Sequence, residues 1–459
     1  MSELPGGWSE TEIGPVNTYS SETLNPAKAP KQTFELYSVP VFAKQKPEIV
    51  DGKDIGSTKQ KVEPDDVLLC KINPRINRVW LVGKKNDHEQ IASSEWIVIR
   101  QPLFDPAFIR FQLQESSFRD RLCAEVSGVG GSLTRAQPKK VESYKLRIAP
   151  LAEQKRIAQK LDALLAQVDT LKARIDAIPA LLKRFREATI SAAMSGRLTE
   201  KWRAYAYPDT EHFSYQGLHV DEPWSHEIES PITWTRHRFD EVIKLSGGSQ
   251  PPKSSFSKVL KPGYVRLIQI RDYKSDAYKV FIEEISTKKF CTTEDVMIAR
   301  YGPPIFQILR GLEGAYNVAL MKATPVAALL NNDYLYWFLK NRQIQNYVEA
   351  GSDRTAGQSG VNKPFLERYP VFLPEIEEQA EIVRRVEQLF AYAEQLEAKV
   401  AAAQQRIDAL TQSLLAKAFR GELVPQDPSD EPASVLLDRI RARRAAAPKP
   451  KRGRKAATS

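Results

Sequence analysis

Two long stretches of this 459-residue chain repeat each other at one fixed offset. The first runs from Glu153 to Leu198 and the second from Glu378 to Leu423, so the offset is 225 residues throughout, with no gap. A repeat of this length predicts two copies of one plan, each made of a body and a helical tail. Matched pairs along the two copies include Ile157 and Ile382, Ala166 and Ala391, Leu171 and Leu396, Ala173 and Ala398, and Ala193 and Ala418.

Both repeats carry apolar residues at helical spacing. From Ile157 to Phe185 the intervals between apolar residues alternate between four and three, and the same alternation runs from Ile382 to Leu414. This is the heptad pattern of a coiled coil.

Each run is bounded as a helix would be. A proline precedes each run, at Pro150 and Pro374, and a glycine follows each, at Gly196 and Gly421. Proline suits a helix entry, and glycine suits the left-handed turn that ends a helix. A fully helical run of this length measures roughly 65 Å at 1.5 Å per residue.

The apolar stripe of each predicted helix must be covered by a partner. The favoured partner is the other repeat in the same chain, and the alternatives are a partner protein or a second copy of the chain. Pro179 stands where the second repeat has Gln404, which predicts a kink or a local break in the first helix.

The segments before the two helices have strand-like patterns. Apolar and β-branched runs predict strands. The expected strands are 67–72, 96–99, 264–270 and 296–299, and the expected short helices are 106–113 and 333–340.

The repeat also extends, more weakly, into these two bodies. Trp8 is echoed by Trp234, Lys71 by Arg300, Phe108 and Phe111 by Leu335 and Phe338, and Pro138-Lys139 by Asn362-Lys363. A glycine-rich loop precedes the last pair in each body, at 128–132 and 357–360.

Composition narrows the class of protein. The formal net charge of +10 favours an acidic partner, most often nucleic acid. Cys70, Cys123 and Cys291 are odd in number and widely spaced, which indicates a reducing compartment without disulfides. The sequence has no apolar run long enough to predict a membrane span, and no signal peptide is visible. A location in the cytoplasm is expected.

Motifs for catalysis and nucleotide binding are missing from the sequence. It has no phosphate-binding loop of the G-x-x-x-x-G-K-[ST] type, no dinucleotide fingerprint and no Asn-Pro-Pro-Tyr. Four of the five histidines, His212, His219, His226 and His237, have spacings that fit no common zinc site. We therefore expect no catalytic residue, metal or cofactor in this chain.

The helical runs resemble a known family. The runs 150–157, 161–169 and 182–186 resemble the central conserved region of specificity subunits of type I restriction–modification enzymes, and 378–393 and 414–423 resemble the distal conserved region. Both are similar to the type IA branch. The bodies match only in outline, at 295–302 and 357–363.

The resemblance implies a mechanism for a non-catalytic subunit. Each body would be a target recognition domain that reads one half of a bipartite, asymmetric site in double-stranded DNA. The helices would set the spacer and dock two modification subunits, which carry S-adenosylmethionine and an adenine-N6 methyltransferase site. Two restriction subunits, motor nucleases that use ATP and magnesium, would join for cleavage.

The expected fold class is α+β. Two mixed α/β target recognition domains are separated by two long helices, which form an intramolecular antiparallel coiled coil with approximate two-fold symmetry. The expected boundaries are a first recognition domain at 1–149, a central helix at 150–198, a linker at 199–230, a second recognition domain at 231–373, a distal helix at 374–423 and a basic, disordered tail at 424–459. The tail either solubilises the chain or contacts phosphates.

Side chains of the types that contact bases and phosphates are candidates for reading DNA. In the first body they are Lys44, Lys46, Lys71, Asn73, Arg75, Arg78, Arg135 and Lys139. In the second they are Ser249, Gln250, Lys253, Gln269, Arg271, Arg300, Tyr301, Gln358, Asn362 and Lys363. For each residue the alternative is a solvated surface side chain.

Two other functions remain open at the level of sequence. One is a stand-alone enzyme acting on nucleic acid through an unrecognised site. The other is a coiled-coil structural adaptor that does not touch DNA.

Overall fold

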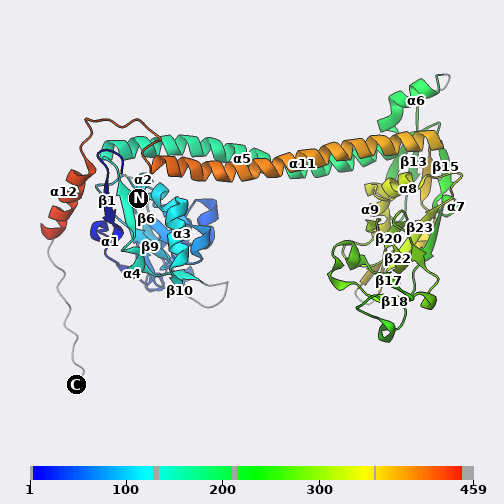
Figure 1. Cartoon of the computed structure of the whole chain (residues 1–459), viewed down its shortest axis with the longest axis horizontal. Helices are drawn as coiled ribbons and strands as arrows, with labels where there is room; N and C mark the ends of the chain where they lie inside the picture. The colour runs from blue at the N-terminus through cyan, green and yellow to red at the C-terminus, as the bar shows by residue number, and fades with distance from the viewer. Residues whose placement is uncertain (1–3, 128–133, 209–213, 356–357, 447–459) are drawn as a thin grey trace. The chain divides into compact units, whose positions relative to one another are not determined.

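Two compact units make up the chain. The computed structural model describes residues 4–127, 134–208, 214–355 and 358–446 (Figure 1). Unit 1 contains residues 1–176 and 402–459, and unit 2 contains residues 177–401. Two long helices, α5 (Leu151–Met194) and α11 (Ile376–Ala418), each contribute a part to both units.

The body of unit 1 is rich in short strands. A five-stranded sheet has the order β2-β5-β8-β3-β4, a three-stranded sheet has the order β7-β6-β9, and β1 pairs with β12 and β10 with β11. The strands are β1 (Ser9–Glu12), β2 (Thr23–Leu24), β3 (Thr33–Tyr37), β4 (Glu48–Asp51), β5 (Lys59–Lys61), β6 (Val67–Cys70), β7 (Val79–Leu81), β8 (Glu89–Ala92), β9 (Trp96–Ile99), β10 (Val126–Ser127), β11 (Arg135–Ala136) and β12 (Lys145–Ile148). The helices are α1 (Ile13–Val16), α2 (Pro106–Gln114), α3 (Ser116–Ala124), α4 (Pro138–Val141) and, after α11, α12 (Ala433–Ala446).

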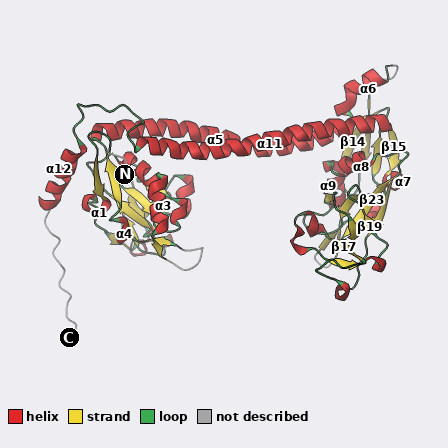
Figure 2. Ribbon diagram, viewed as in Figure 1, coloured by secondary structure: helices red, strands yellow, loops and turns green. Residues whose placement is uncertain are grey.

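The body of unit 2 contains two four-stranded sheets. Their strand orders are β16-β23-β20-β21 and β18-β17-β22-β19, and the unit also has the ladders β13-β14, β15-β26 and β24-β25. Figure 2 shows strands and short helices together in this unit. The strands are β13 (Tyr215–Val220), β14 (His226–Pro231), β15 (Thr235–Arg238), β16 (Ile243–Gly247), β17 (Tyr264–Ile268), β18 (Phe281–Glu283), β19 (Phe290–Cys291), β20 (Val296–Ala299), β21 (Ile308–Leu309), β22 (Gly314–Tyr316), β23 (Leu320–Pro325), β24 (Asp353–Thr355), β25 (Gln358–Gly360) and β26 (Pro370–Leu373). The helices are α6 (Glu200–Ala206), α7 (Phe239–Val242), α8 (Asn332–Leu339), α9 (Arg342–Ala350) and α10 (Lys363–Leu366).

The two long helices run antiparallel within each unit. In unit 1, Lys172 pairs with Asp408 at 3.0 Å and Gln404 donates to Asp176 at 2.8 Å, so the partner number falls as the α5 number rises. In unit 2, Arg186 of α5 pairs with Glu397 of α11. The predicted intramolecular antiparallel coiled coil is therefore confirmed.

Each body has its core completed by the helix that comes from the other repeat. In unit 1 the last turns of α11 bury Leu415 in the core of the first body, and Phe419, directly after the helix, is buried there too. In unit 2 the end of α5 buries Ile190 and Met194 in the core of the second body. The start of the helix that directly follows each body packs into the same core, so each core uses segments far apart in the chain.

Most predicted elements are present near their expected bounds. β9 and β20 match the expected strands, β6 and β17 end two residues early, and α2 and α8 match the expected short helices within one residue. Of the kink or local break expected at Pro179, the break is wrong, because α5 continues through this proline as one helix, and the kink stays a prediction.

Two segments expected to lack structure are folded. The predicted linker at 199–230 contains α6 and the β13-β14 hairpin, and Arg203 and Ser230 within it are fully buried. The predicted disordered tail at 424–459 contains α12, whose Leu436, Leu437 and Ile440 are buried. In both cases polar composition hid a few apolar or paired residues that give the segment a packed face.

Candidate nucleic-acid interface

A tryptophan from each body is hydrogen-bonded to a glutamate at the start of the following long helix. Trp8 Nε1 donates to Glu153 at 3.1 Å, and Trp234 Nε1 donates to Glu378 at 3.1 Å. All four side chains are buried. A buried indole N–H needs an acceptor, so these bonds fix each body to its helix.

A glutamine beside each glutamate adds a second attachment. Gln154 accepts the backbone N–H of Asp105 at 2.9 Å, and Gln379 accepts that of Asn331 at 2.7 Å. Both amides donate to a backbone carbonyl just before the helix, at 2.8 Å and 2.9 Å. We refer to the Trp, Glu and Gln contacts at each helix start as the first lock, in unit 1, and the second lock, in unit 2. The locks are the strongest structural trace of the repeat.

The electrostatics of the two locks differ. Glu378 pairs with Arg203 of α6 at 2.6 Å, and Arg203 is 0 % exposed. Glu153 accepts from Trp8, but its Oε1 has no hydrogen-bond partner among the described residues, and burial raises the pKa of its carboxyl. Arg156, three residues after Glu153, is instead paired with Asp430 at 2.6 Å.

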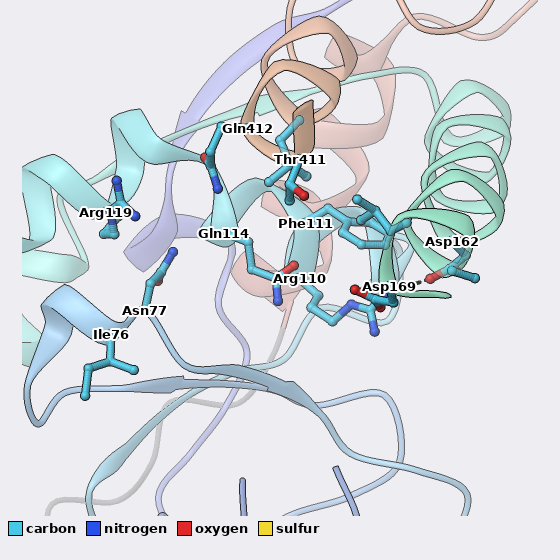
Figure 3. A pocket seen from close by; sticks show the side chains of 13 residues that line it. Ile76, Asn77, Arg110, Phe111, Gln114, Arg119, Asp162, Asp169, Thr411 and Gln412 are labelled. Atoms are coloured by element: carbon cyan, nitrogen blue, oxygen red, sulfur yellow. Dashed lines mark hydrogen bonds and ion pairs between the residues drawn. The ribbon is translucent and has the colours of Figure 1, made fainter. Parts of the chain in front are cut away.

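A polar pocket lies farther along the long helices of unit 1 than the first lock, from Asp162 onward on α5. Its volume is about 520 Å³, and its walls come from α2, α3, α5, α11 and the turn at Pro74–Ile76 (Figure 3). Arg110 stacks its guanidinium 4.3 Å from the ring centre of Phe111 and pairs with Asp162 at 2.8 Å. Leu165 and Thr411 also line the pocket.

The matching place in unit 2 is filled by larger side chains. At the repeat offset, Leu165 corresponds to Phe390 and Thr411 to Arg186. Trp337 of α8 packs on Phe390 with ring centres 4.8 Å apart, and the Arg186 guanidinium lies 5.6 Å from the Phe390 ring centre. The two junctions therefore share a backbone plan and differ in side-chain volume.

Lys71 and Arg300 occupy equivalent backbone positions, as the repeat predicts. Each follows a buried central strand. The backbone N–H of each donates to the carbonyl of the residue just before the neighbouring strand: Lys71 to Glu95 O at 3.0 Å and Arg300 to Ala319 O at 2.8 Å. Each carbonyl accepts an N–H from the segment leading into a short helix, Ala136 at 2.8 Å and Val361 at 2.9 Å. A cationic side chain thus leaves the same place in both bodies.

In the first body the structure gathers five of the expected contacts around the end of β6. Ile72 bridges Arg135, the Asn73 N–H donates to Thr134 O at 2.9 Å, and the Arg78 carbonyl accepts from Cys70. The cluster consists of Lys71, Asn73, Arg75, Arg78 and Arg135. Lys139 is exposed on α4, and Lys44 and Lys46 are exposed on a separate segment after β3.

In the second body the expected contacts gather near the ends of β16 and β20. Tyr301 bridges Gly360, and the Arg300 guanidinium lies 5.2 Å from the Tyr301 ring centre. Arg300 Nε has no hydrogen-bond partner among the described residues. Ser249 bridges Asn317, whose N–H donates to the carbonyl that precedes Gln269.

Several of these side chains also have structural duties. Ser249 shares a hydrogen bond with Thr287 at 2.6 Å, Asn362 caps α10, and Lys363 pairs with Glu367 at 3.3 Å. Gln250, Lys253 and Arg271 are exposed, and Arg271 lies over the ring of Tyr278 at 5.3 Å. Gln358 lies in β25. The glycine-rich loop at 128–132 lies wholly outside the described residues, because residues 128–133 are not described. The loop at 357–360 lies partly outside them, because residues 356–357 are not described.

Comparison with known proteins identifies the relatives of this architecture. Residues 231–403 match the family described as the type I restriction modification DNA specificity domain. The chain is 31% identical to the type I restriction enzyme EcoKI specificity subunit of Escherichia coli strain K12, over 88% of this chain and 86% of that protein. It is 32% identical to the EcoBI specificity subunit of Escherichia coli, over 77% and 78% of the two chains.

The chain belongs to the family of type I restriction enzyme specificity subunits. It is a DNA sequence-specificity subunit, and as such a non-catalytic one.

Solved structures agree with the fold of this specificity subunit. A chain from work on complex assembly and conformational transition of the type I R-M system matches with a TM-score of 0.66, 19% identity and coverage of 92% and 100%. The HsdS subunit from Thermoanaerobacter tengcongensis matches with a TM-score of 0.57, 21% identity and coverage of 92% and 98%. The likeness supports two mixed domains joined by a pair of long helices.

Metal sites and membrane spans are absent from the described residues. No cluster of His, Cys, Asp and Glu side chains there has the makings of a metal site. Over the same residues, no helix combines the length and apolar character needed to cross a bilayer.

Two alignments inside the bodies need correction by one residue. The helices α2 and α8 are capped by Asp105 and Asn331, so Phe108 matches Tyr334 rather than Leu335. The helices α4 and α10 begin after Gln137 and Asn362, so Asn362 matches Gln137 rather than Pro138. Similar apolar neighbours made the shifted alignments look equally good in the sequence.

The locks of the specificity subunit were not foreseen as functional positions. Glu153, Gln154, Glu378 and Gln379 marked the start of the repeat, but their contacts to the bodies were not anticipated. The signal was available, because a buried tryptophan recurs in both bodies and a charged residue recurs at the first turn of both long helices. Arg203 had no such signal, since the repeat supplies no second copy of it.

Proposed function

We propose that this specificity subunit reads a bipartite, asymmetric DNA site, with one half read by each body. The observation that carries this proposal is the equivalence of Lys71 and Arg300, two cations held at the same backbone position in two bodies whose surrounding loops differ. A shared frame with different side chains is what two unlike half-sites require, because base contacts specify and phosphate contacts position.

The long helices are proposed to set the spacer between the half-sites and to dock two modification subunits. Pairing of only two helices leaves apolar side chains partly uncovered. Leu171 is 49% exposed, Leu181 53%, Tyr392 56% and Leu410 45%. Further helices from a partner would cover these exposed apolar side chains, since apolar surface favours burial.

The remaining components of the complex are proposed from the family. The modification subunits would supply S-adenosylmethionine and the adenine-N6 methyltransferase site, and two restriction subunits would supply ATP- and magnesium-dependent translocation and cleavage. This chain would select the site for both activities.

The assignment of one body to one half-site is tested by exchange. Replacing residues 1–149 with the first body of another member of the family should change one half of the methylated sequence in the host genome, measured by mapping methylated adenines. The reciprocal exchange of residues 231–373 is the matched control and should change the other half. A change in both halves after either exchange would refute the assignment.

The proposed ruler is tested by length. Removing one heptad from α5 and the facing heptad from α11 shortens the pair by roughly 10 Å, which corresponds to about three base pairs at 3.4 Å each. Both half-sites should stay the same while the spacer shortens. An unchanged spacer in an assembled, active complex would remove the ruler from the proposal.

A further inference from the structure

The connection between β16 and β17 of unit 2 is basic throughout. Residues 242–271, which include it, contain six Lys and Arg residues and no Asp or Glu. Three of the expected DNA contacts, Ser249, Gln250 and Lys253, lie in its first part. A segment of one charge sign favours a polyanion such as DNA over a protein surface of mixed charge. The second part, residues 257–263, forms a turn that we call the basic tip.

The basic tip presents two adjacent apolar side chains to solvent. Val259 is 67% exposed and Leu260 is 61% exposed. Lysines flank the pair on both sides, at Lys258 and Lys261. Burial of the pair against another molecule would be favourable, because apolar surface is removed from water. The flanking cations indicate that this molecule is negatively charged.

Hydrogen bonds hold the backbone of the basic tip in one conformation. The Ser257 hydroxyl donates to the Val259 carbonyl at 2.6 Å and accepts the Val259 N–H at 3.2 Å. The Tyr264 N–H donates to the Lys261 carbonyl at 3.0 Å and closes a turn whose last central residue, Gly263, has a φ of 77°. A proline followed by a left-handed glycine is typical of a type II turn. The apolar pair is therefore presented on an ordered backbone, which limits the entropy lost on binding.

The basic tip is joined to β18, at the end of the unit 2 body that lies away from α11 (Figure 1). Ser257 and Phe281 exchange two backbone hydrogen bonds, at 2.9 Å and 2.8 Å. The Glu284 N–H donates to the Gly263 carbonyl at 2.9 Å. The tip thus lies apart from the α11 surface on which a modification subunit is proposed to dock, and this position favours DNA as its partner.

We propose that the basic tip is an apolar wedge that partly unstacks one base step from the minor groove, at or beside the half-site read by the second domain. The proposal rests on the proposed function, because it requires the second body to lie on DNA. Leu260 and Val259 enter between neighbouring base pairs, as apolar wedges do in minor-groove proteins. Lys258 and Lys261 contact phosphates on the two sides of the groove.

The dimensions of the basic tip suit this arrangement. Three residue steps separate the two lysines, so their backbone can span up to about 10 Å at 3.3–3.6 Å per residue. The minor groove is roughly 6 Å wide. The lysines can therefore reach both strands while the apolar pair lies over the base edges between them.

A wedge responds to the deformability of DNA, whereas polar side chains respond to base edges. Pyrimidine–purine steps unstack most easily, so the second half of the site should prefer such a step at the wedge. Gln250 and Lys253 cannot supply this preference, because they recognise hydrogen-bond donors and acceptors. The basic tip therefore adds a separate element of specificity to the second domain.

The test uses the complete complex with its modification subunits, bound to duplexes that carry the mapped methylation site. Permanganate oxidises unstacked thymines, and the spacer and flanking pairs are varied so that each step there carries a thymine in one duplex. The wedge variant is Val259→Ser with Leu260→Ser, which changes exposed side chains and keeps the backbone bonds to Ser257. Ile285→Ser is the matched control, because Ile285 is 92% exposed but follows the acidic Glu284 and lies outside the tip.

The natural complex should show unstacking at one step, and the wedge variant should lose both this signal and the preference for a pyrimidine–purine step there. The control should keep both. Methyltransferases flip their target base, and that signal should persist in the wedge variant because it comes from the modification subunits. A lysine variant, Lys258→Gln with Lys261→Gln, should make the slope of log K against log salt shallower by roughly 2, at about 0.9 for each phosphate contact.

Four outcomes would overturn the proposal. They are a natural complex in which only the target adenines are unstacked, a wedge variant with the natural unstacking, a lysine variant with the natural salt slope, and a wedge variant that assembles less well with the modification subunits. The last would make the tip a protein contact. Failure of the proposed function is distinct, because the natural complex would then lack any preference for its half-sites.

Discussion

The first lock and the second lock solve one mechanical problem with different side chains. Both attach a body to a long helix through a Trp–Glu hydrogen bond of 3.1 Å. The second adds a buried arginine, whereas the first has an unpaired carboxylate oxygen. Farther along the helices, unit 2 has a packed aromatic pair and unit 1 an open pocket of about 520 Å³. The hydrogen-bond geometry is thus common to both repeats, while charge compensation and volume are local.

The difference follows from what succeeds each long helix. After α5 the chain turns at Gly196 into α6 and delivers Arg203 to Glu378. After α11 the chain turns at Gly421 and reaches α12, which is docked by apolar residues and sends no cation to Glu153. The contrast predicts that equivalent substitutions have unequal effects.

The largest inequality is expected at the two lock glutamates. Glu378→Gln keeps the hydrogen bond from Trp234 but leaves Arg203 buried without its counter-charge, which should cost about 3–5 kcal/mol. Glu153→Gln is the matched control and should cost under ~1 kcal/mol, because no cation contacts it. Denaturant unfolding of the two variants measures both. Equal losses would mean that the Glu378–Arg203 pair adds nothing beyond the shared hydrogen bond.

A second inequality is expected in the packing farther along the long helices, at Leu165 in unit 1 and Phe390 in unit 2. Replacing Trp337 by Phe and Phe390 by Leu gives unit 2 smaller side chains at this place, and should cost about 2–3 kcal/mol through lost aromatic contact and burial. Leu165→Phe, the reciprocal change in unit 1, should change the unfolding free energy by less than ~1 kcal/mol, since the pocket has room. A large loss from Leu165→Phe would show that the pocket cannot accept a larger side chain.

The equivalence of Lys71 and Arg300 can be broken by substitution in DNA binding. Arg300→Ala should weaken binding or relax specificity in one half-site by roughly 1–3 kcal/mol if it reads a guanine. Lys71→Ala should act on the other half-site and by a similar or smaller amount. Binding of the assembled complex to duplexes altered in one half-site at a time measures both effects. Loss confined to the same half-site for both variants would contradict the equivalence.

The smallest effect is expected in the pH dependence of unit 1. Burial raises the pKa of Glu153, so the folded state binds this proton more tightly than the unfolded state. Its unfavourable contribution is present above the folded pKa and is relieved as the pH falls through it. The stability of the natural chain relative to Glu153→Gln should therefore rise as the pH is lowered through the raised pKa towards the ordinary glutamate pKa of about 4.3. A pH-independent difference would contradict this account.

The sequence was most informative where one periodicity decided the structure. The heptads of α5 and α11, the strands β9 and β20, and the helices α2 and α8 follow from local patterns that tertiary contacts reinforce. Pro179 did not break α5. Proline removes one backbone hydrogen bond of the helix, but the heptad pairing on both sides of it is kept. Local cost was outweighed by the packing of a long helix.

The sequence was least informative where a few distant contacts decided the structure. Arg203 is buried because it pairs with Glu378, which lies 175 positions away in the chain. The helix α12 is held by apolar residues that pack into the same core as Trp8, near the other end of the chain. The candidate DNA contacts have the same difficulty. Residue type selects Asn362 and Lys363, but only the fold shows that one caps α10 and the other pairs with Glu367.

The exchange of helix ends between the two repeats also sets an order of completion during synthesis. The core of the second body needs the end of α5, which is already made when that body emerges, and the start of α11, which follows at once. The core of the first body needs Phe419 and Ile440, which are made only after the whole of unit 2. At about 5–20 residues per second the first domain waits on the order of tens of seconds with apolar surface uncovered. The domain that is begun first is therefore the one finished last, and it is the one most in need of protection on the ribosome.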